Sequence, residues 1–280
     1  MTTLTLDLAR FTVGADAIPE QARTSAARAI SAVVGDAAAG ADSPALNVLA
    51  GLASSLGTPP EAGVPGRSER YAASWSALLT AAAASSAAPA SYATVVVAAA
   101  LAAAGARSLR LRPVAEAVAV GLEITARLDN WLAGSLGAFD PVPVLGRLGA
   151  AAAAARLLGM APDAAAHGFG IAATQATGLL ALTAEGAADL QNGKAAADGV
   201  EAAWLAADGF TGPPAAIEGR RGLAALLAPD ALLAPETAAD GLGRTWSSAA
   251  TILYPRYDPA DLDLTVDACL SSFPPAKQRR

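Results

Sequence analysis

The stretch from Tyr71 to Ala106 contains no charged residue, and this feature narrows the folds open to the chain more than any other. It is built mainly from Ala, with Ser, Thr and Pro89 interspersed, whereas membrane-spanning helices depend on Leu, Ile, Phe and Val. We therefore expect two buried helices that break near Pro89, and we regard a transmembrane helix as the disfavoured alternative.

Alanine dominates the rest of the chain as well. Apolar residues make up 54% of the 280 residues, yet aromatic residues make up only 5%. Ala has the highest helix propensity and loses no side-chain entropy on folding. Strand-forming residues gather in few places, chiefly the string "TVVVAAAL". The composition predicts an all-α protein in which small side chains let the helices pack closely.

Turn residues divide the chain into a series of expected helices. The expected ranges are 4–13, 19–40, 45–56, two helices within 71–106, and then 113–132, 145–158, 162–182, 194–207 and, more weakly, 261–272. Because no repeat and no long linker divides this series, residues 1–280 are expected to form one domain. Residues 273–280 are expected to be a disordered tail.

The charge pattern argues against several classes of function. The formal net charge is −6 and the 19 Lys and Arg residues are scattered, whereas nucleic-acid binding needs a basic stripe. One His and one Cys cannot build a zinc centre, so we expect neither a metal nor a cofactor. The opening "MTTLTLDLARF" lacks the features of a signal peptide, so a cytoplasmic location is expected.

The string "LQNGKAAADGVEAAWLAADGFTGPPAAIEGRRGL" carries the clearest resemblance to a known family. Its Gly-x-Ala-Ala helix, its Gly-Phe-Thr-Gly-Pro turn and its Glu-Gly pair resemble the hallmark of the MmgE/PrpD family, which includes 2-methylcitrate dehydratase and cis-aconitate decarboxylase. "AIPEQARTSAARAISAVVGDAAAG" and "AVAVGLEITARL" resemble further helices of that family. The resemblance covers essentially the whole chain and implies the family's helical domain without its smaller α+β lid domain.

The hallmark turn itself is expected to build the scaffold rather than to contact a ligand. Gly209 stands where a helix commonly ends in a left-handed residue. The segment from Thr211 to Pro214 then reverses the chain, because proline fixes its own φ angle.

Members of the family are lyases or isomerases of small polycarboxylates, and the resemblance places their acid–base residues at positions that this chain has changed. Asp140 and Gln191 stand in place of two His residues, and Ala188 and Ile252 in place of two Lys residues. The lone histidine, His167, lies at none of these positions and is expected to be a surface or packed residue. Since each acid–base group contributes roughly two to four powers of ten in rate, the usual reaction of the family is not expected here.

Two interpretations of the changed site stay open. The first is a repurposed cyclase, isomerase or lyase of secondary metabolism, for example antibiotic biosynthesis. It would act without a cofactor on a largely apolar intermediate, by shape and a few polar groups. The second is a non-catalytic binding module or partner subunit, completed by a separately encoded lid-type partner. A conventional dehydratase of a small carboxylic acid is a third, disfavoured interpretation. A homodimer is expected under both of the first two.

Polar residues near the changed positions supply the candidate site. Asp140 is the first choice as a catalytic group because apolar residues flank it, although an Asp-Pro pair also serves simply to cap a loop. The candidate catalytic residues are Asp140, Gln191 and Tyr254, and the candidate residues for binding a small-molecule substrate are Trp75, Tyr92, Glu185, Asp189 and Asn192.

Overall fold

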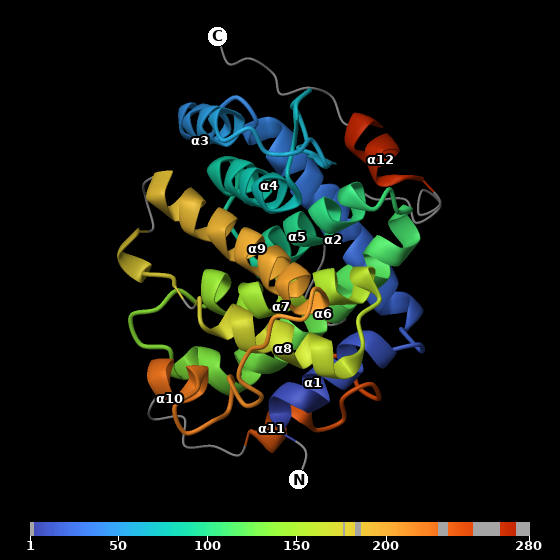
Figure 1. Ribbon diagram of the computed structural model, residues 1–280, viewed down its shortest axis with the longest axis vertical. Coiled ribbons are helices and arrows are strands. Elements are labelled where there is room, and N and C mark those ends of the chain that lie inside the picture. The colour runs from blue at the N-terminus through green and yellow to red at the C-terminus, as the bar shows by residue number, and fades with distance from the viewer. Residues whose placement is uncertain (1–2, 176, 183–185, 229–234, 249–263, 273–280) are drawn as a thin grey trace.

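The computed structural model describes residues 3–175, 177–182, 186–228, 235–248 and 264–272. Helices make up most of this part of the chain, which confirms the all-α prediction (Figure 1). The helices are α1 (Leu4–Gly14), α2 (Glu20–Gly40), α3 (Pro44–Ser55), α4 (Ala73–Ala87), α5 (Tyr92–Ala106), α6 (Leu111–Leu132), α7 (Pro141–Leu158), α8 (Pro162–Ala173), α9 (Gly186–Ala207), α10 (Leu223–Leu227), α11 (Glu236–Ala239) and α12 (Val266–Ser272). The remaining elements are the 3-10 helices η1 (Ala133–Ser135) and η2 (Leu180–Leu182) and the antiparallel strands β1 (Ala62–Gly63) and β2 (Arg70–Tyr71).

The uncharged stretch forms the two helices that its composition predicts. A break at residues 88–91 separates α4 from α5, and Ser91 and Thr94 form a capping box at the start of α5. Every residue from Ala93 to Gly105 is buried. Among the described residues, no helix combines the length and the apolar character that crossing a bilayer requires.

Small residues let the central helices approach one another closely. α7 lies in the middle of the molecule against α5, α6, α8 and α9, while α9 also packs along α4 (Figure 1). Where α6 crosses α7, a Cβ atom added to Gly149 would lie 2.7 Å from the carbonyl oxygen of Gly121. No Cβ atom fits at that distance, so the two glycines set the separation of these helices.

α7 begins at Pro141 and not at residue 145 as expected. The reason is an N-cap: the carboxylate of Asp140 accepts the Val142 N–H at 2.9 Å. Proline is tolerated in the first turn, because the N–H groups there have no partner within the helix. The loop-capping role considered for Asp140 is therefore confirmed.

α9 also begins earlier than expected, at Gly186 and not at Lys194. Its first turns include glycines and Asn192, which are poor helix formers. Gly193 packs so tightly on α4 that an added Cβ atom would lie 2.7 Å from the Leu78 carbonyl oxygen, so tertiary packing outweighs the local preference. α8, by contrast, ends at Ala173, well before the expected residue 182.

The hallmark turn after α9 builds the scaffold, as predicted. Gly209 has a φ of 90°, the left-handed conformation that favours glycine. Gly212 lies against α8, where His167 Nδ1 is 3.0 Å from its carbonyl oxygen. Glu218 reaches back to the first turn of α1 and accepts the Thr5 hydroxyl at 2.6 Å. The single histidine is thus a packed residue, and the turn ties α1, α8 and α9 together.

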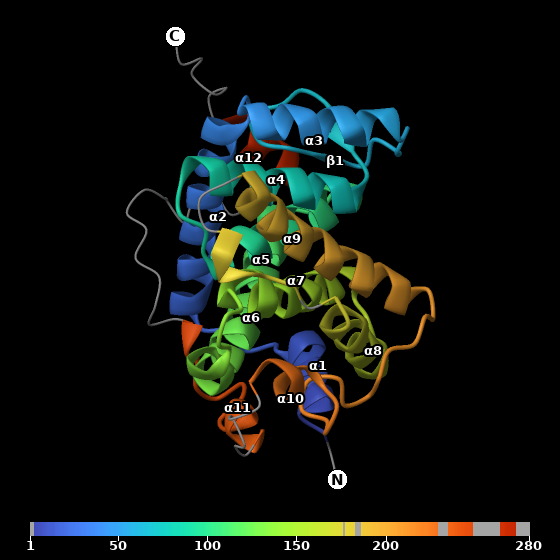
Figure 2. The ribbon, with the colours of Figure 1, turned by 90° about the vertical axis from the view of Figure 1, so that its left-hand side faces the viewer.

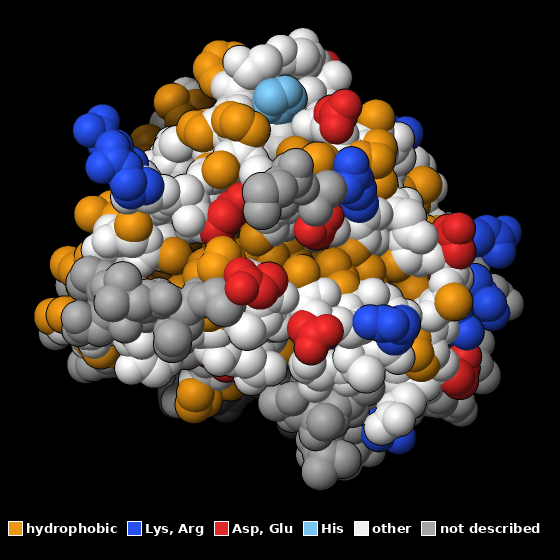
Figure 3. Space-filling model, turned by 90° about the horizontal axis from the view of Figure 1, so that it is seen from below, with side chains coloured by type: hydrophobic (Ala, Val, Ile, Leu, Met, Phe, Trp, Pro, Cys, Tyr) orange, Lys and Arg blue, Asp and Glu red, His pale blue; other side chains and the backbone are white. Residues whose placement is uncertain are grey.

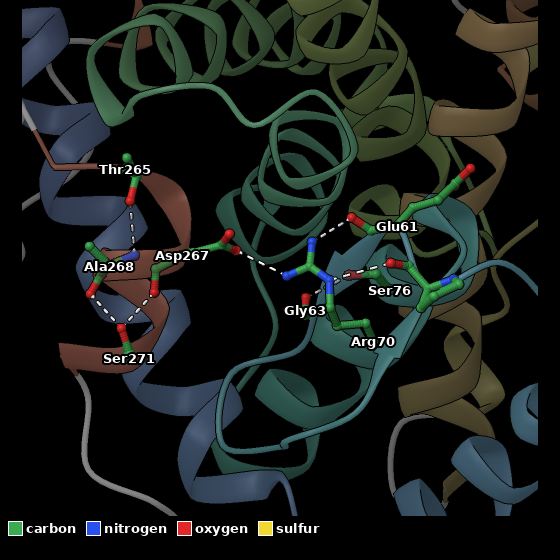
Figure 4. A network of polar contacts seen from close by, with 9 residues as sticks. Glu61, Gly63, Arg70, Ser76, Thr265, Asp267, Ala268 and Ser271 are labelled. Carbon is green, nitrogen blue, oxygen red and sulfur yellow. Dashed lines mark hydrogen bonds and ion pairs between the residues drawn. The ribbon is translucent and has the colours of Figure 1, made fainter.

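Arg70 joins the strand pair to the last described helix. Its guanidinium donates to the Glu61 carbonyl at 2.6 Å and lies 3.2 Å from the Asp267 carboxylate of α12 (Figure 4). α12 thereby docks near β1 and α3, at the end of the molecule opposite to α1 and α11 (Figure 2). Of the weakly expected helix 261–272, residues 261–263 lie outside the described residues, as does the expected tail 273–280.

Candidate functional site

Asp140 and Gln191, which the resemblance to the family places at changed catalytic positions, are direct neighbours. Gln191 lies in the second turn of α9, and its Nε2 donates to Asp140 Oδ2 at 3.3 Å. Gln191 Oε1 accepts the Leu179 N–H at 3.1 Å. An N–H donor on one side and a carboxylate on the other fix which end of the amide is which. Each group holds the other in one orientation.

A short backbone pairing between residues 138–140 and 178–180 supports the contact between Asp140 and Gln191. Asp140 donates its own N–H to the Gly178 carbonyl at 3.2 Å, and Leu180 donates to Ala138 at 3.1 Å. At Gly178 an added Cβ atom would lie 2.6 Å from a carbon of the Pro143 ring, so a side chain would push the two segments apart. The absence of a side chain at Gly178 therefore lets this segment pack directly against the start of α7.

Tyr92, a predicted substrate-binding residue, lies close to the same place. Its hydroxyl donates to Asp129 Oδ1 of α6 at 2.5 Å. Burial raises the pKa of the Tyr92 phenol above its ordinary value, and the hydrogen bond to Asp129 and the negative charges of Asp129 and Asp140 raise it further. We refer to Tyr92, Asp129, Asp140 and Gln191 as the polar cluster.

Two other predicted binding residues lie on the same helix as Gln191. Asn192 is buried and donates to the Ser85 hydroxyl of α4 at 3.2 Å, while its buried Oδ1 has no partner among the described residues. Asp189 is partly buried, and desolvation raises the pKa of its carboxyl. The first turns of α9 thus place polar groups toward both α7 and α4.

The remaining predictions fall outside this arrangement. Trp75 precedes Ser85 by ten residues on α4, which corresponds to about 15 Å along the helix, and it packs against the hydrophobic core. Among the described residues, no hydrogen bond joins Trp75 to the polar cluster. Glu185 and Tyr254 lie outside the described residues, and their roles stay predictions.

Sequence reasoning missed a buried ion pair beside the polar cluster. Arg147 of α7 lies 3.2 Å from Asp198 of α9, and Lys194 lies 3.0 Å from the other oxygen of the same carboxylate. Arg147 also donates to the Thr177 hydroxyl at 2.8 Å, next to Gly178. Burial lowers the pKa of Arg147, and the negative charge of Asp198 opposes that effect. A single charge inside the apolar run "VLGRLGAAAA" was the available signal, because a buried charge needs a partner.

The polar cluster is acidic. Neither Asp129 nor Asp140 forms an ion pair with any Lys or Arg of the described residues. In the same part of the chain, no group of three or more His, Cys, Asp or Glu side chains is suited to hold a metal ion. What the cluster offers is two carboxylates, a phenol held in its neutral form and an oriented amide.

The raised pKa of Tyr92 leads to a test by alkaline titration. The unfolded chain ionises its tyrosines near pH 10, as model peptides do at about 10. The stability that comes from the neutral phenol is therefore complete below about pH 10 and is lost as the pH rises toward the folded-state value. We expect ultraviolet absorbance to show a late phenolate step, and we expect Tyr92→Phe to remove it.

Asp129→Asn is the matched control for this titration. It keeps a hydrogen-bond acceptor but removes the negative charge, so the late step should move to lower pH while the other tyrosines stay unchanged. A wild-type Tyr92 that ionises near pH 10 in the folded protein would contradict the described geometry.

The fold and the cluster together define a class of protein. It is an all-α domain whose polar groups gather at the start of α5, near the end of α6, and at the starts of α7 and α9. The chain belongs to the MmgE/PrpD family, since residues 7–236 match the MmgE/PrpD N-terminal domain. It is similar to the cis-aconitate decarboxylase-like protein oryM of Aspergillus oryzae, with 39% identity over 100 residues. That match covers 34% of this chain and 21% of the relative, so the chain spans about a fifth of the curated protein that it matches.

Proposed function

We propose that this protein is a repurposed MmgE/PrpD enzyme, a cyclase, isomerase or lyase that acts without a cofactor on a largely apolar intermediate of secondary metabolism in the cytoplasm. The observation that carries the proposal is the contact between Asp140 and Gln191 at 3.3 Å. These residues occupy changed catalytic positions, yet they form an ordered pair beside a second ordered pair, Tyr92 and Asp129. Asp140 also caps α7 and Gln191 also accepts the Leu179 N–H, so this order serves the scaffold as well as the proposed site.

The charge of the polar cluster supports a substrate without several carboxylates. A carboxylate of the substrate placed about 4 Å from Asp140 or Asp129 would cost about 4 kcal/mol near a protein surface. No described cation contacts either residue to offset that repulsion. A neutral substrate avoids this cost, and it also fits the apolar surroundings.

Each side chain of the site has a different proposed role. Asp140 can take up and return one proton, while Gln191 keeps its carboxylate in a fixed direction. The neutral phenol of Tyr92 donates its one proton to Asp129, so its oxygen can accept a hydrogen bond from a hydroxyl group of the substrate. The unpartnered amide oxygen of Asn192 can accept one in the same way after a small movement. Cyclisation, isomerisation or elimination needs few other catalytic groups. Holding the reacting atoms in contact can by itself lower the activation barrier by up to about 7–11 kcal/mol.

A non-catalytic partner subunit is the second candidate, and one observation favours it. Val48, Leu52 and Leu56 form an apolar stripe along α3, with exposed fractions of 74%, 50% and 58%. Such a stripe suits an interface with a second protein, which is what a partner subunit requires. We also propose a homodimer, which is compatible with both candidates. A lid-type partner that covers the polar cluster is compatible with either candidate.

Comparative metabolite analysis tests the proposal. Deletion of the gene in its native host should cause an intermediate to accumulate, and the purified protein should convert that intermediate. Asp140→Ala and Gln191→Ala should each lower the rate at least about 100-fold, as expected for loss of an acid–base group or of its positioning. Asp42→Ala, which removes an exposed carboxylate on another part of the surface, should leave the rate unchanged.

Two results would contradict the enzyme proposal. One is full activity of both site variants. The other is turnover of cis-aconitate at an ordinary enzymatic rate, because the acidic cluster should repel that anion. Absence of any accumulated intermediate, together with a stable complex between this chain and a second protein, would favour the partner subunit instead.

A further inference from the structure

A hollow of about 620 Å³ lies at the end of the molecule formed by α1 and α11. Seen from below, this face shows an apolar recess bordered by acidic side chains and by Lys or Arg side chains (Figure 3). The residues that matter for its chemistry are Asp7, Arg10, Phe11, Gly14, Asp16 and Trp246. A volume of this size is in the usual range for a small-molecule site.

One wall of the hollow is held in place by a buried ion pair. Glu123 and Arg127 of α6 are 0% and 5% exposed and lie 2.6 Å apart. Arg127 donates to the carbonyls of Asp240 at 2.6 Å and Thr245 at 2.7 Å, and Glu123 accepts the Ser248 N–H at 2.9 Å. The segment that carries Trp246 is therefore fixed on both sides before any ligand arrives, which lowers the cost of binding.

The aromatic part of the wall spans two elements. The rings of Phe11 and Trp246 are 5.4 Å apart and inclined at 58°. Such a pair offers π-electron density to a positive group within about 6 Å of a ring. The whole 239–246 segment lies beyond residues 7–236, which match the family's N-terminal domain, so the family match does not account for this part of the wall.

One carboxylate at the hollow, that of Asp16, is open to a positive ligand. Asp7 is 3.6 Å from Arg10, so that carboxylate already has a partner. Asp16 is exposed and forms no ion pair with a described residue, although the positive charge of Arg156 acts on it from α7. α1 ends at Gly14, and the partial negative charge of that helix end is already met by Arg156, which donates to the carbonyls of Thr12 and Ala15. Asp16 is thus the available anchor for a cation.

The hollow is distinct from the polar cluster. Arg156 donates to the carbonyls of Thr12 and Ala15 beside the hollow, whereas Asp140 stands at the opposite end of the same helix, α7. Arg156 follows Asp140 by 16 positions, which correspond to about 24 Å along the helix. We propose that this hollow is a second binding site, which takes a small organic cation: an amine with an apolar body that lies against Phe11 and Trp246 and is anchored by Asp16.

Three probes of one shape test this assignment: phenethylamine, phenethyl alcohol and hydrocinnamate. Nitrogen–proton correlation NMR resolves the indole groups of the four Trp residues, and Trp246→Phe identifies the signal of Trp246. Phenethylamine should shift that signal to saturation and bind about tenfold more tightly than the alcohol. The anionic hydrocinnamate should bind more weakly still.

Matched variants separate specific recognition from the general effect of a negative protein. Asp16→Asn should reduce the affinity for phenethylamine to that for the alcohol, whereas Asp208→Asn, the same change on an exposed residue after α9, should have no effect. Gly14→Leu should abolish binding of both probes, because a Cβ atom there meets nothing within 4 Å and the side chain can occupy the hollow.

Several results would overturn the proposal. They are equal affinities for amine and alcohol, equal effects of Asp16→Asn and Asp208→Asn, undisturbed binding in Gly14→Leu, and a lack of saturation with the amine. None of these outcomes depends on the activity proposed for the polar cluster, so the two proposals fail independently.

Discussion

Replacement of Asp198 by Ala is expected to lower the free energy of unfolding by about 3–5 kcal/mol, the cost typical of removing one partner from a buried ion pair. Arg147 is only 1% exposed, and Asp198 is the only carboxylate within ion-pair distance of it among the described residues. Without that carboxylate, the charge of Arg147 would remain inside the protein with nothing but the Thr177 hydroxyl beside it. Urea denaturation followed by circular dichroism measures the change.

Two further variants make this prediction specific. Lys194 shares the Asp198 carboxylate but is 47% exposed, so Lys194→Ala should cost less than about 1 kcal/mol. The double variant Arg147→Met, Asp198→Leu replaces the pair with apolar side chains and should recover most of the lost stability. If Asp198→Ala proved as mild as Lys194→Ala, the buried pair described between α7 and α9 would be wrong.

The second large effect is expected at the crossing of α6 and α7. Gly149→Ala should lower the free energy of unfolding by about 3 kcal/mol, the upper end of the range for an overfilled core. The new Cβ atom would collide with the buried hydroxyl of Thr125 and with the Gly121 carbonyl. The Thr125 hydroxyl is itself bound to the Gly121 carbonyl, so neither atom can move away without displacing the helix.

Gly51→Ala is the matched control, because it makes the same chemical change on an exposed face of α3. A Cβ atom there meets nothing within 4 Å, and Ala is the better helix former, so this variant should gain up to about 1 kcal/mol. Opposite signs for the two substitutions, measured in the same denaturation experiment, would show that contact and not helix propensity limits the α6–α7 crossing. Stabilisation by both would refute the described packing.

Asp198→Ala also bears on the polar cluster. Arg147 holds Thr177, and the residues that follow it support Asp140 and Gln191. Loosening the contact between α7 and α9 should therefore disturb the contact between Asp140 and Gln191 before the whole domain unfolds. In this way the stability of the bundle and the geometry of the candidate site depend on the same helices.

The sequence by itself determined the features that depend on neighbouring residues. The absence of charge between Tyr71 and Ala106, with a proline inside it, sufficed to predict α4, α5 and the break between them. Gly209 marked the end of α9 because a left-handed residue there favours glycine. The resemblance to the family pointed to Asp140 and Gln191 as a pair, although no local pattern connects positions 51 residues apart.

Only the tertiary structure decided which distant groups meet. Nothing in the residues around Asp129 indicated that its carboxylate would accept the Tyr92 hydroxyl, 37 residues away. The early start of α9 and the pairing of Arg147 with Asp198 likewise follow from the packing of α7 and α9. Local propensities act within a few residues, whereas the partner of a buried charge is set by how helices cross, and crossings are fixed by side-chain volumes across the whole bundle.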